Sequence, residues 1–205
     1  MHDNKLKLIS TPIDFPKIEP DNWDNWWSYW NNYSSLVSKI SKNHNPNSNS
    51  WRGVDLYIKK GYEDLANTLY KFPYIDGTHL VQNFFSMIDK FPMEVNVIRA
   101  ISSLNNIKPH KDFDYPNYSL RSIIYDDNPK QTWWYYYDRK IKFLNMPNFT
   151  NTWVYADNET THGSMYYKNH KKIILMFFGD WKEGSLEKIY KDAKNKFSEF
   201  VLYKN

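Results

Sequence analysis

The pair His110 and Asp112, within IKPHKDFDYPNYSLRSIIY (107–125), has residue types and a spacing that could bind a metal ion. Alternate residues of an extended strand point to the same side, so an imidazole nitrogen and a carboxylate oxygen from this pair can reach one point in space. Two ligands alone bind a metal weakly. A site therefore requires a third ligand from another part of the chain.

His162 is the histidine best placed to supply that third ligand. It lies fifty residues after Asp112 and follows the strand-like stretch TNTWVYADN. The other histidines lie at the N-terminus, in a polar loop, near a helix start or beside three lysines: His2, His44, His79 and His170. Two histidines and one carboxylate form the facial triad of non-haem Fe(II) oxygenases, which leaves coordination positions open for a co-substrate and oxygen. The residues therefore predict a site made of His110, Asp112 and His162.

Lys172 is a second feature of the same region. It lies ten residues after His162, at the start of the apolar run KIILMFFG (172–179). If the co-substrate were 2-oxoglutarate, its distal carboxylate would require a buried cation, and a lysine at the inner end of a strand could supply one. The alternative is a charge that flanks an apolar strand and limits aggregation. Together with the triad, we favour the co-substrate role.

These motifs resemble the Fe(II)/2-oxoglutarate-dependent dioxygenase superfamily. That superfamily uses an H-x-D…H triad with Arg or Lys about ten residues after the second histidine, and PHKD…THGS…HKKIILMF has the same order and spacing. The stretch NYSLRSIIY also resembles a strand of the aspartyl/asparaginyl β-hydroxylase-like and free-proline hydroxylase-like branches. The resemblance covers about residues 94–180. It departs at one point, because the close branches usually have Arg where this chain has Lys172.

The resemblance implies a cofactor and two co-substrates: Fe(II), 2-oxoglutarate and O2. Fe(II) would be bound by His110, Asp112 and His162. The distal carboxylate of 2-oxoglutarate would pair with Lys172 and a hydroxyl from Ser164. The implied reaction is hydroxylation of an unactivated C–H bond with release of succinate and CO2. Asp112 favours hydroxylation over halogenation, because halogenases of this superfamily leave that coordination position free for chloride.

Two arginines extend the implied site. Arg121, in NYSLRSIIY, matches an arginine that helps to hold carboxylates, so we expect it to bind a carboxylate of the substrate or co-substrate. Arg99, in NVIRAISS, matches a position that often adds a polar contact to the co-substrate. Arg121 and the branch resemblance favour an amino acid as substrate, either free or within a peptide. The aromatic run that begins at Trp133 could line the pocket, but we expect core packing.

Other classes of protein fit the same residues. A cupin-type metal-dependent dioxygenase or isomerase would use the triad without 2-oxoglutarate, and substitution of Lys172 would leave its activity largely intact. A non-catalytic jelly-roll binding module would keep the fold, but loss of a ligand is the usual mark of such a module and all three ligands are present. The triad residues could also be unrelated residues on the surface.

Composition and charge exclude several further classes. The chain of 205 residues has no cysteine, which excludes disulfides, Cys-ligated zinc and iron–sulfur clusters. Its net charge is +4, but the positive residues are scattered, which disfavours a nucleic-acid partner. The polar start MHDNKLKLIS predicts no signal peptide, and the longest apolar run, IILMFF (173–178), is too short to span a membrane. We expect a soluble cytoplasmic protein that acts on a small molecule or a peptide.

The elements that must position these residues begin with helices. Apolar periodicity predicts helices at four places: 21–42, 62–72, 78–91 and 185–203. Thr78 and Ser185 are the expected N-caps of the last two. In the first helix, Trp and Tyr side chains recur at i, i+3, i+4 and i+7, which we attribute to core packing. The stretch WRGVDLYIKK (51–60) predicts a short strand.

From residue 93 the pattern changes to short β-type runs, a spacing typical of a sandwich or barrel. The runs are EVNVIRAIS, YSLRSIIY, TWWYYYDRKIKFL, TNTWVYA and KKIILMFFG. With the resemblance, we expect an α+β fold: a double-stranded β-helix (jelly-roll, cupin-like) with N-terminal flanking helices and one C-terminal helix. We expect a single domain, 1–205, with a mainly helical support region at 1–92, the catalytic core at 93–180 and the C-terminal helix at 181–205.

Overall fold

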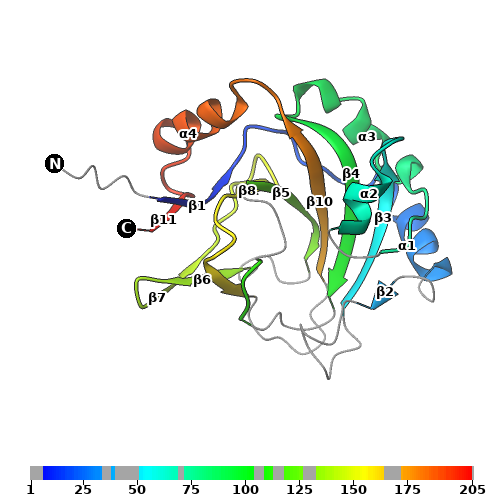
Figure 1. Ribbon diagram of the computed structural model, residues 1–205, viewed down its shortest axis with the longest axis horizontal. Coiled ribbons are helices and arrows are strands. Elements are labelled where there is room, and N and C mark those ends of the chain that lie inside the picture. The colour runs from blue at the N-terminus through cyan, green and yellow to red at the C-terminus, as the bar shows by residue number, and fades with distance from the viewer. Residues whose placement is uncertain are drawn as a thin grey trace.

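Two antiparallel β-sheets make up most of the computed structural model, which describes residues 7–33, 38–39, 51–68, 72–103, 109–112, 118–126, 133–163 and 172–204. The larger sheet has eight strands, in the order β11 (Leu202–Lys204), β1 (Lys7–Pro12), β8 (Thr152–Tyr155), β5 (Ser119–Asp126), β10 (Lys172–Trp181), β4 (Met93–Ser103), β3 (Trp51–Ile58) and β2 (Ser38–Lys39). The smaller sheet has three, in the order β7 (Lys140–Phe143), β6 (Trp134–Tyr137) and β9 (Thr161–Gly163). Figure 1 shows the small sheet across from the concave side of the large one.

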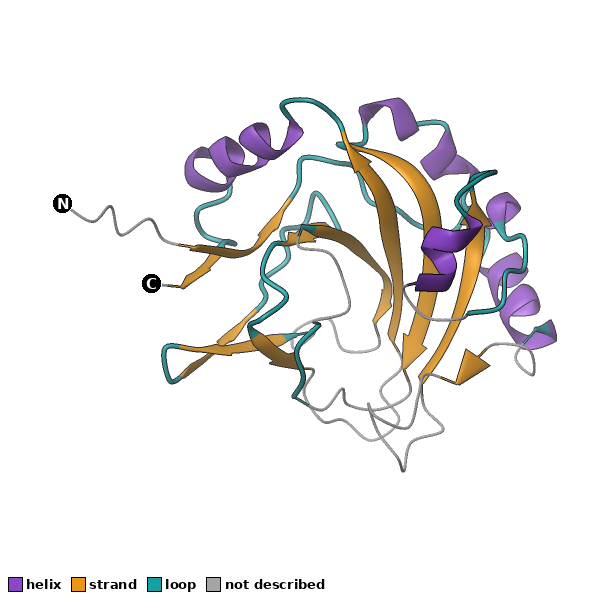
Figure 2. Cartoon of the chain, viewed as in Figure 1, coloured by secondary structure: helices purple, strands orange, loops and turns teal. Residues whose placement is uncertain are grey.

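The helices lie mostly on the outer side of the large sheet, where Figure 2 draws them in purple. They are α1 (Trp23–Asn32), α2 (Glu63–Thr68), the 3-10 turn η1 (Thr78–Leu80), α3 (Gln82–Phe85), the 3-10 turn η2 (Ile88–Lys90) and α4 (Ser185–Asn195). Trp26 of α1, Phe84 of α3 and Ile189 of α4 are buried in one cluster with Phe177 of β10. The tryptophan-rich helix therefore packs into the core, as its periodicity predicts.

The side chains of strand β10 alternate between the outer face and the inner face of the large sheet. Its odd-numbered residues from Ile173 to Phe177 belong to the outer cluster, and its even-numbered residues from Ile174 to Phe178 belong to an inner cluster. This follows from the alternation of side chains along a strand. The inner cluster also contains Trp133 and Tyr135 from the small sheet and its approach, and Trp153 and Tyr155 of β8. Aromatic side chains thus fill much of the space between the sheets.

The strand register sets two arginines on either side of one methionine. Met176 of β10 is opposite Arg99 of β4 and also opposite Arg121 of β5. Since opposed residues of neighbouring strands point to the same face, both arginines share the inner side with Met176. Both are buried. The interior therefore combines an apolar lining with charged groups.

The first predicted helix begins as expected but ends early. Asn22 is its N-cap, and its side chain accepts hydrogen bonds from the backbone N–H groups of Asp24 (2.8 Å) and Asn25 (3.2 Å). The helix ends at Asn32. Ser38 and Lys39 instead pair with β3 as the short strand β2, so the prediction of a helix to residue 42 is wrong there. Pairing with a sheet edge overrides helical periodicity at this point.

The predicted helix 78–91 is three short turns, η1, α3 and η2. Thr78 is not an N-cap; the Asp76 carboxylate accepts from its N–H at 3.0 Å. A distant residue, Asp21, caps the next turn by accepting from the N–H groups of Gln82 (2.6 Å) and Asn83 (2.9 Å). Tertiary contacts therefore determine where each turn begins, and the single-helix prediction is wrong.

The last predicted helix is also shorter than its pattern. Gly184, with φ 71°, precedes its first residue Ser185, so Ser185 is not the N-cap. The helix ends at Asn195, and Leu202–Lys204 pair with β1 as strand β11, so the helix prediction to residue 203 is wrong. As at the end of α1, residues that the periodicity assigned to a helix form a strand instead.

The run TWWYYYDRKIKFL forms a hairpin of β6 and β7. Asp138 (φ 49°) and Arg139 (φ 59°) form its two-residue turn, which matches the positive φ values of a type I′ hairpin.

The predicted support region 1–92 contributes strands as well as helices. β1 and β3 are integral to the large sheet, and β1 was not expected from the sequence. The pairing of β3 with β4 continues one residue past β3, where the Lys59 N–H donates to the Asn96 carbonyl at 2.8 Å. Among the described helices, none has the length and apolar character needed to cross a membrane.

Candidate metal centre

His110, Asp112 and His162 converge on one point between the two sheets. Each offers one ligand atom, and these atoms all lie within 4.8 Å of one another. His110 Nε2 lies 3.3 Å from Asp112 Oδ1, and His162 Nε2 lies 3.5 Å from Asp112 Oδ2. The three residues that the sequence singled out are therefore close enough to bind one ion.

Backbone pairing positions the three side chains. His110 and His162 form a single antiparallel bridge, in which each N–H donates to the other's carbonyl at 3.0 and 2.9 Å. His162 belongs to β9, whereas His110 and Asp112 lie outside the named strands. The Asp112 N–H donates to the Asn158 carbonyl at 3.0 Å, which fixes this segment against the turn before β9.

The His162 ring is held in one tautomer. Its Nδ1 lies 2.9 Å from Tyr155 Oη and 3.1 Å from the Thr160 carbonyl, and Tyr155 Oη donates to that same carbonyl at 3.0 Å. A carbonyl only accepts, so we assign the proton to Nδ1 and leave Nε2 with its lone pair. That atom is buried and has no hydrogen-bond partner among the described residues. Metal-bound histidines are oriented in this way by a hydrogen bond to the second ring nitrogen.

The charges of the site also suit a cation. Burial raises the pKa of Asp112, but the Arg121 guanidinium and the contacts with His110 and His162 outweigh burial and hold it well below its usual value. Burial lowers the pKa of His162, although Asp112 opposes that change. A carboxylate that stays ionised and an imidazole that stays neutral are the protonation states that bind metal ions.

Arg121 contacts the metal-site carboxylate directly. Its guanidinium donates to Asp112 Oδ2 and lies 4.9 Å from the centre of the Tyr155 ring. The sequence did not predict this contact. Its expected role, binding a carboxylate of the substrate or co-substrate, stays a prediction, and the contact adds a role in orienting Asp112.

Lys172 lies in the interior, close to the triad. Its side chain is 2% exposed, and its Nζ lies 5.1 Å from the centre of the Trp133 ring. The Trp133 ring in turn lies 5.7 Å from the His162 ring, so Lys172 and His162 both lie near the same indole. Burial lowers the pKa of Lys172 to about 8, despite the nearby Asp126. A charge that only protects a strand against aggregation would be exposed, and Lys172 is not.

The remaining predicted site residues lie elsewhere. Arg99 forms a two-point ion pair with Asp55 (2.7 and 3.1 Å) and donates to the Ala66 carbonyl of α2 at 3.1 Å. Its guanidinium also lies 4.2 Å from the centre of the Phe72 ring. Its contact with the co-substrate stays a prediction. Ser164 lies outside the described residues.

The turn before β9 contains residues that position two of the candidate ligands and that sequence reasoning missed. Asp157, whose side chain is fully buried, accepts from the Glu159 N–H (3.0 Å) and the Thr160 hydroxyl (2.7 Å) and pairs with Lys204. This turn provides the Asn158 carbonyl that holds Asp112 and the Thr160 carbonyl that orients His162. The segment DNET begins with Asp and Asn, which favour turns because their side chains accept from nearby backbone N–H groups. This composition is the signal that could have identified the turn.

No family model and no curated protein sequence matches the chain. The similar solved structures include two oxygenases. One is an oxidoreductase of the 2OG-Fe(II) oxygenase family from Burkholderia pseudomallei, with 11% identity, a TM-score of 0.40, and coverage of 75% of this chain and 78% of that one. The other is a prolyl-4-hydroxylase from Pseudomonas putida, with 8% identity, a TM-score of 0.46, and coverage of 85% and 94%. The superfamily named for the first is the one that the sequence motifs resemble.

Proposed function

We propose that the protein is an Fe(II)- and 2-oxoglutarate-dependent oxygenase that hydroxylates an unactivated C–H bond of an amino acid, free or within a peptide. The observation that carries this proposal is the convergence of His110, Asp112 and His162, with the buried Nε2 of His162 unpartnered among the described residues. Two imidazoles and one carboxylate fit Fe(II) and leave positions for other ligands.

The protein's own groups have separate tasks in this proposal. His110, Asp112 and His162 hold the ion. Arg121 keeps Asp112 ionised and oriented, because its guanidinium contacts the carboxylate. When bound, Fe(II) and 2-oxoglutarate would supply the activation of O2, with succinate and CO2 as products. The apolar and aromatic lining excludes water from the reacting groups.

Lys172 is the proposed partner of the distal carboxylate of 2-oxoglutarate. Three facts support this role: its depth in the interior, its place on the inner face of β10, and its nearness to the Trp133 ring, which also lies near His162. A cupin-type enzyme without 2-oxoglutarate would need no buried lysine there beyond its 3.7 Å ion pair with Asp126, which offsets only part of the cost of burial. Lys172 therefore favours the 2-oxoglutarate enzyme over that alternative.

The finer description of the fold belongs to the same proposal. Facing sheets of eight and three antiparallel strands, with the triad between them, support a double-stranded β-helix of the jelly-roll type. We further propose that the protein works in the cytoplasm on a small-molecule or peptide substrate, without nucleic acid or membrane as partner.

An anaerobic titration tests the function. Fe(II) and then 2-oxoglutarate are added to the metal-free protein, and the weak visible charge-transfer band of the chelate is recorded. We expect the band in the wild type and a weaker band at equal ligand concentration in Lys172→Ala. Bound metal without a band would exclude the 2-oxoglutarate enzyme in favour of a cupin-type enzyme. A protein that binds no metal would leave only a binding module.

A further inference from the structure

Asp126 is a buried carboxylate beside Lys172 that the proposed reaction does not yet use. It is the last residue of β5, and the strand register sets it opposite Lys172, the first residue of β10. The side chains are 5% and 2% exposed, and Asp126 Oδ2 lies 3.7 Å from Lys172 Nζ. An internal carboxylate thus already lies next to the cation that the co-substrate would need.

The ion pair between these residues is a loose one. Charge-assisted hydrogen bonds between an ammonium and a carboxylate are about 2.7–2.9 Å long, shorter than the distance observed here. Burial disfavours the charge on Lys172 more than Asp126 favours it, so its pKa falls to about 8. A buried pair at this separation offsets only part of the loss of hydration. A carboxylate that reached Lys172 at hydrogen-bond distance would stabilise the ammonium better.

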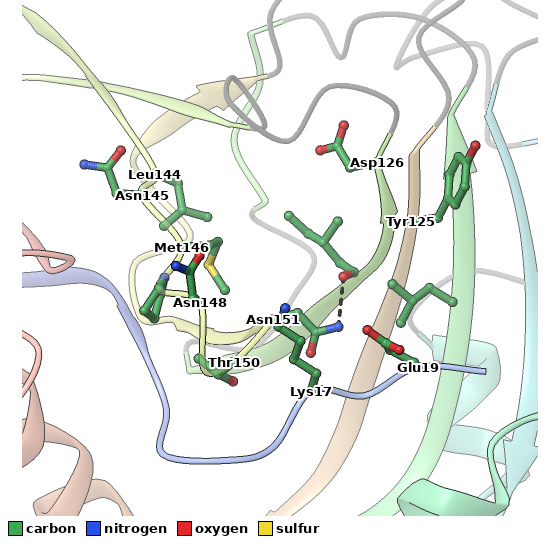
Figure 3. A pocket seen from close by; sticks show the side chains of 13 residues that line it. Lys17, Glu19, Tyr125, Asp126, Leu144, Asn145, Met146, Asn148, Thr150 and Asn151 are labelled. Atoms are coloured by element: carbon green, nitrogen blue, oxygen red, sulfur yellow. Dashed lines mark hydrogen bonds between the residues drawn. The ribbon is translucent and has the colours of Figure 1, made fainter. Parts of the chain in front are cut away.

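Asp126 also borders a cavity into which it can turn. The cavity has a volume of about 560 Å³ and lies between the end of β5, the segment 144–151 and the segment 17–19. Figure 3 shows Asp126 among the side chains that line it, together with Asn145, Asn148 and Asn151. The Asn151 amide already donates to the Ile18 and Ile123 carbonyls, but water in the open volume can hydrate a carboxylate. Asp126 therefore has a polar environment available away from Lys172.

We propose that Asp126 takes the place of the co-substrate's distal carboxylate on Lys172, and that 2-oxoglutarate binds by exchanging with it while Asp126 turns into the cavity. The inference rests on the proposed function. It makes Asp126 a residue that sets the affinity and specificity for the co-substrate. Each state keeps one carboxylate beside the ammonium, so the buried charge stays balanced throughout.

The exchange has a consequence for ligand choice. A 2-oxo acid with a distal carboxylate must displace Asp126, and part of its binding free energy is used for this. Pyruvate has the same 2-oxo acid group but no distal carboxylate, so it leaves Asp126 in place. Removing the charge of Asp126 should therefore strengthen the binding of 2-oxoglutarate and leave the binding of pyruvate unchanged.

The test is calorimetric binding of each ligand to Mn(II)-loaded protein, in which no turnover occurs. We expect Asp126→Asn to lower the Kd for 2-oxoglutarate about tenfold, which corresponds to about 1.4 kcal/mol. Glu19→Gln is the matched control, because Glu19 lines the same cavity but is exposed. This control and the pyruvate titrations should show no change. Asp126→Ala provides a second variant, and circular dichroism checks that both are folded.

Several results would overturn the exchange. If Asp126→Asn binds 2-oxoglutarate as the wild type does or more weakly, Asp126 is a bystander or positions Lys172 for the ligand. If both variants misfold, a crystal structure of the wild type with Mn(II) and 2-oxoglutarate decides, since Asp126 should then lie in the cavity and not beside Lys172. Failure of the wild type to bind 2-oxoglutarate while it binds Mn(II) would instead refute the proposed function.

Discussion

His162 Nε2 and Asp112 Oδ2 lie 3.5 Å apart, with the histidine proton held on the opposite ring nitrogen. Both atoms are buried electron-pair donors. Two such atoms repel each other unless a proton or a cation lies between them. The low pKa of His162, caused mainly by burial, disfavours the proton. The Arg121 guanidinium already contacts Asp112 Oδ2, and a metal ion bound by both atoms would also satisfy the lone pair of His162 Nε2.

The first prediction concerns metal binding to this pair. A divalent metal at one hundred times its Kd should raise the free energy of unfolding of the wild type by about 2.7 kcal/mol. His162→Gln should show no such increase at the same metal concentration, because it removes one ligand. Urea unfolding with Mn(II), and again with EDTA, measures both.

His79→Gln is the matched control for this measurement. His79 is exposed and lies outside the triad. Its substitution should leave the metal-dependent stabilisation unchanged. An equal stabilisation of His162→Gln and wild type would contradict a metal site at His162.

The second prediction concerns the turn that Asp157 organises. Asp157→Ala removes the acceptor for the Thr160 hydroxyl and the Glu159 N–H, so the carbonyls that hold Asp112 and His162 lose their fixed positions. Loss of a group that orients metal ligands typically lowers metal affinity by about tenfold or more. Calorimetric titration with Mn(II) measures the affinity.

Asp14→Asn serves as the control for Asp157→Ala. Asp14 is an exposed carboxylate that pairs with Lys196 at 3.0 Å, far from the turn before β9 in the chain. Its substitution should leave the Mn(II) affinity unchanged. An unaltered affinity in Asp157→Ala would show that the turn holds the ligands without this carboxylate.

The triad was predictable from the sequence because its chemistry restricts it to few residues. With six histidines and no cysteine in the chain, His110, Asp112 and His162 were almost the only set with suitable order and spacing. The structure brings them together through one backbone bridge. The pairing of Asp126 with Lys172 was not predictable, because it depends on the register of β5 and β10, which includes a shift between Ile173 and Ile174.

Helix ends were the least predictable part of the fold. The periodicity of α1 and α4 continues past Asn32 and Asn195, yet nearby residues pair with β3 and β1 as strands. Pairing with a strand that is distant in the sequence supplies backbone hydrogen bonds that no local pattern reveals. The same reasoning explains why β1 was missed, since its partners β8 and β11 lie far along the chain.

The third prediction concerns the pH dependence of stability due to Lys172. Its pKa is about 8 in the folded protein, against an ordinary value of 10.5. Between these values the unfolded chain keeps a proton that the folded protein has released, so this group's contribution to the free energy of unfolding rises with pH. At 1.36 kcal/mol per unit, the rise approaches about 3 kcal/mol. Below pH 8 both states are protonated and the contribution is constant.

Urea unfolding of the wild type and Lys172→Met from pH 7 to pH 10 measures this effect. The difference in the free energy of unfolding between wild type and variant should grow in favour of the wild type above pH 8. Taking the difference removes the titration of tyrosines and other lysines, which both proteins share. Parallel curves for the two proteins would contradict a lowered pKa for Lys172.

The fourth prediction separates two roles for Arg99. Its guanidinium is fully buried and paired at two points with Asp55, so Arg99→Met leaves a buried carboxylate without that partner. Breaking a buried ion pair in this way costs about 3–5 kcal/mol. The double variant Arg99→Met/Asp55→Leu should recover much of that loss, because apolar residues can replace a buried pair. If Arg99 serves structure alone, the double variant binds 2-oxoglutarate with the wild-type Kd in the Mn(II)-loaded protein. If its guanidinium also contacts the co-substrate, the same variant is stable but binds 2-oxoglutarate at least about tenfold more weakly. That result would assign Arg99 to the binding site as well as to the structure of the sheet.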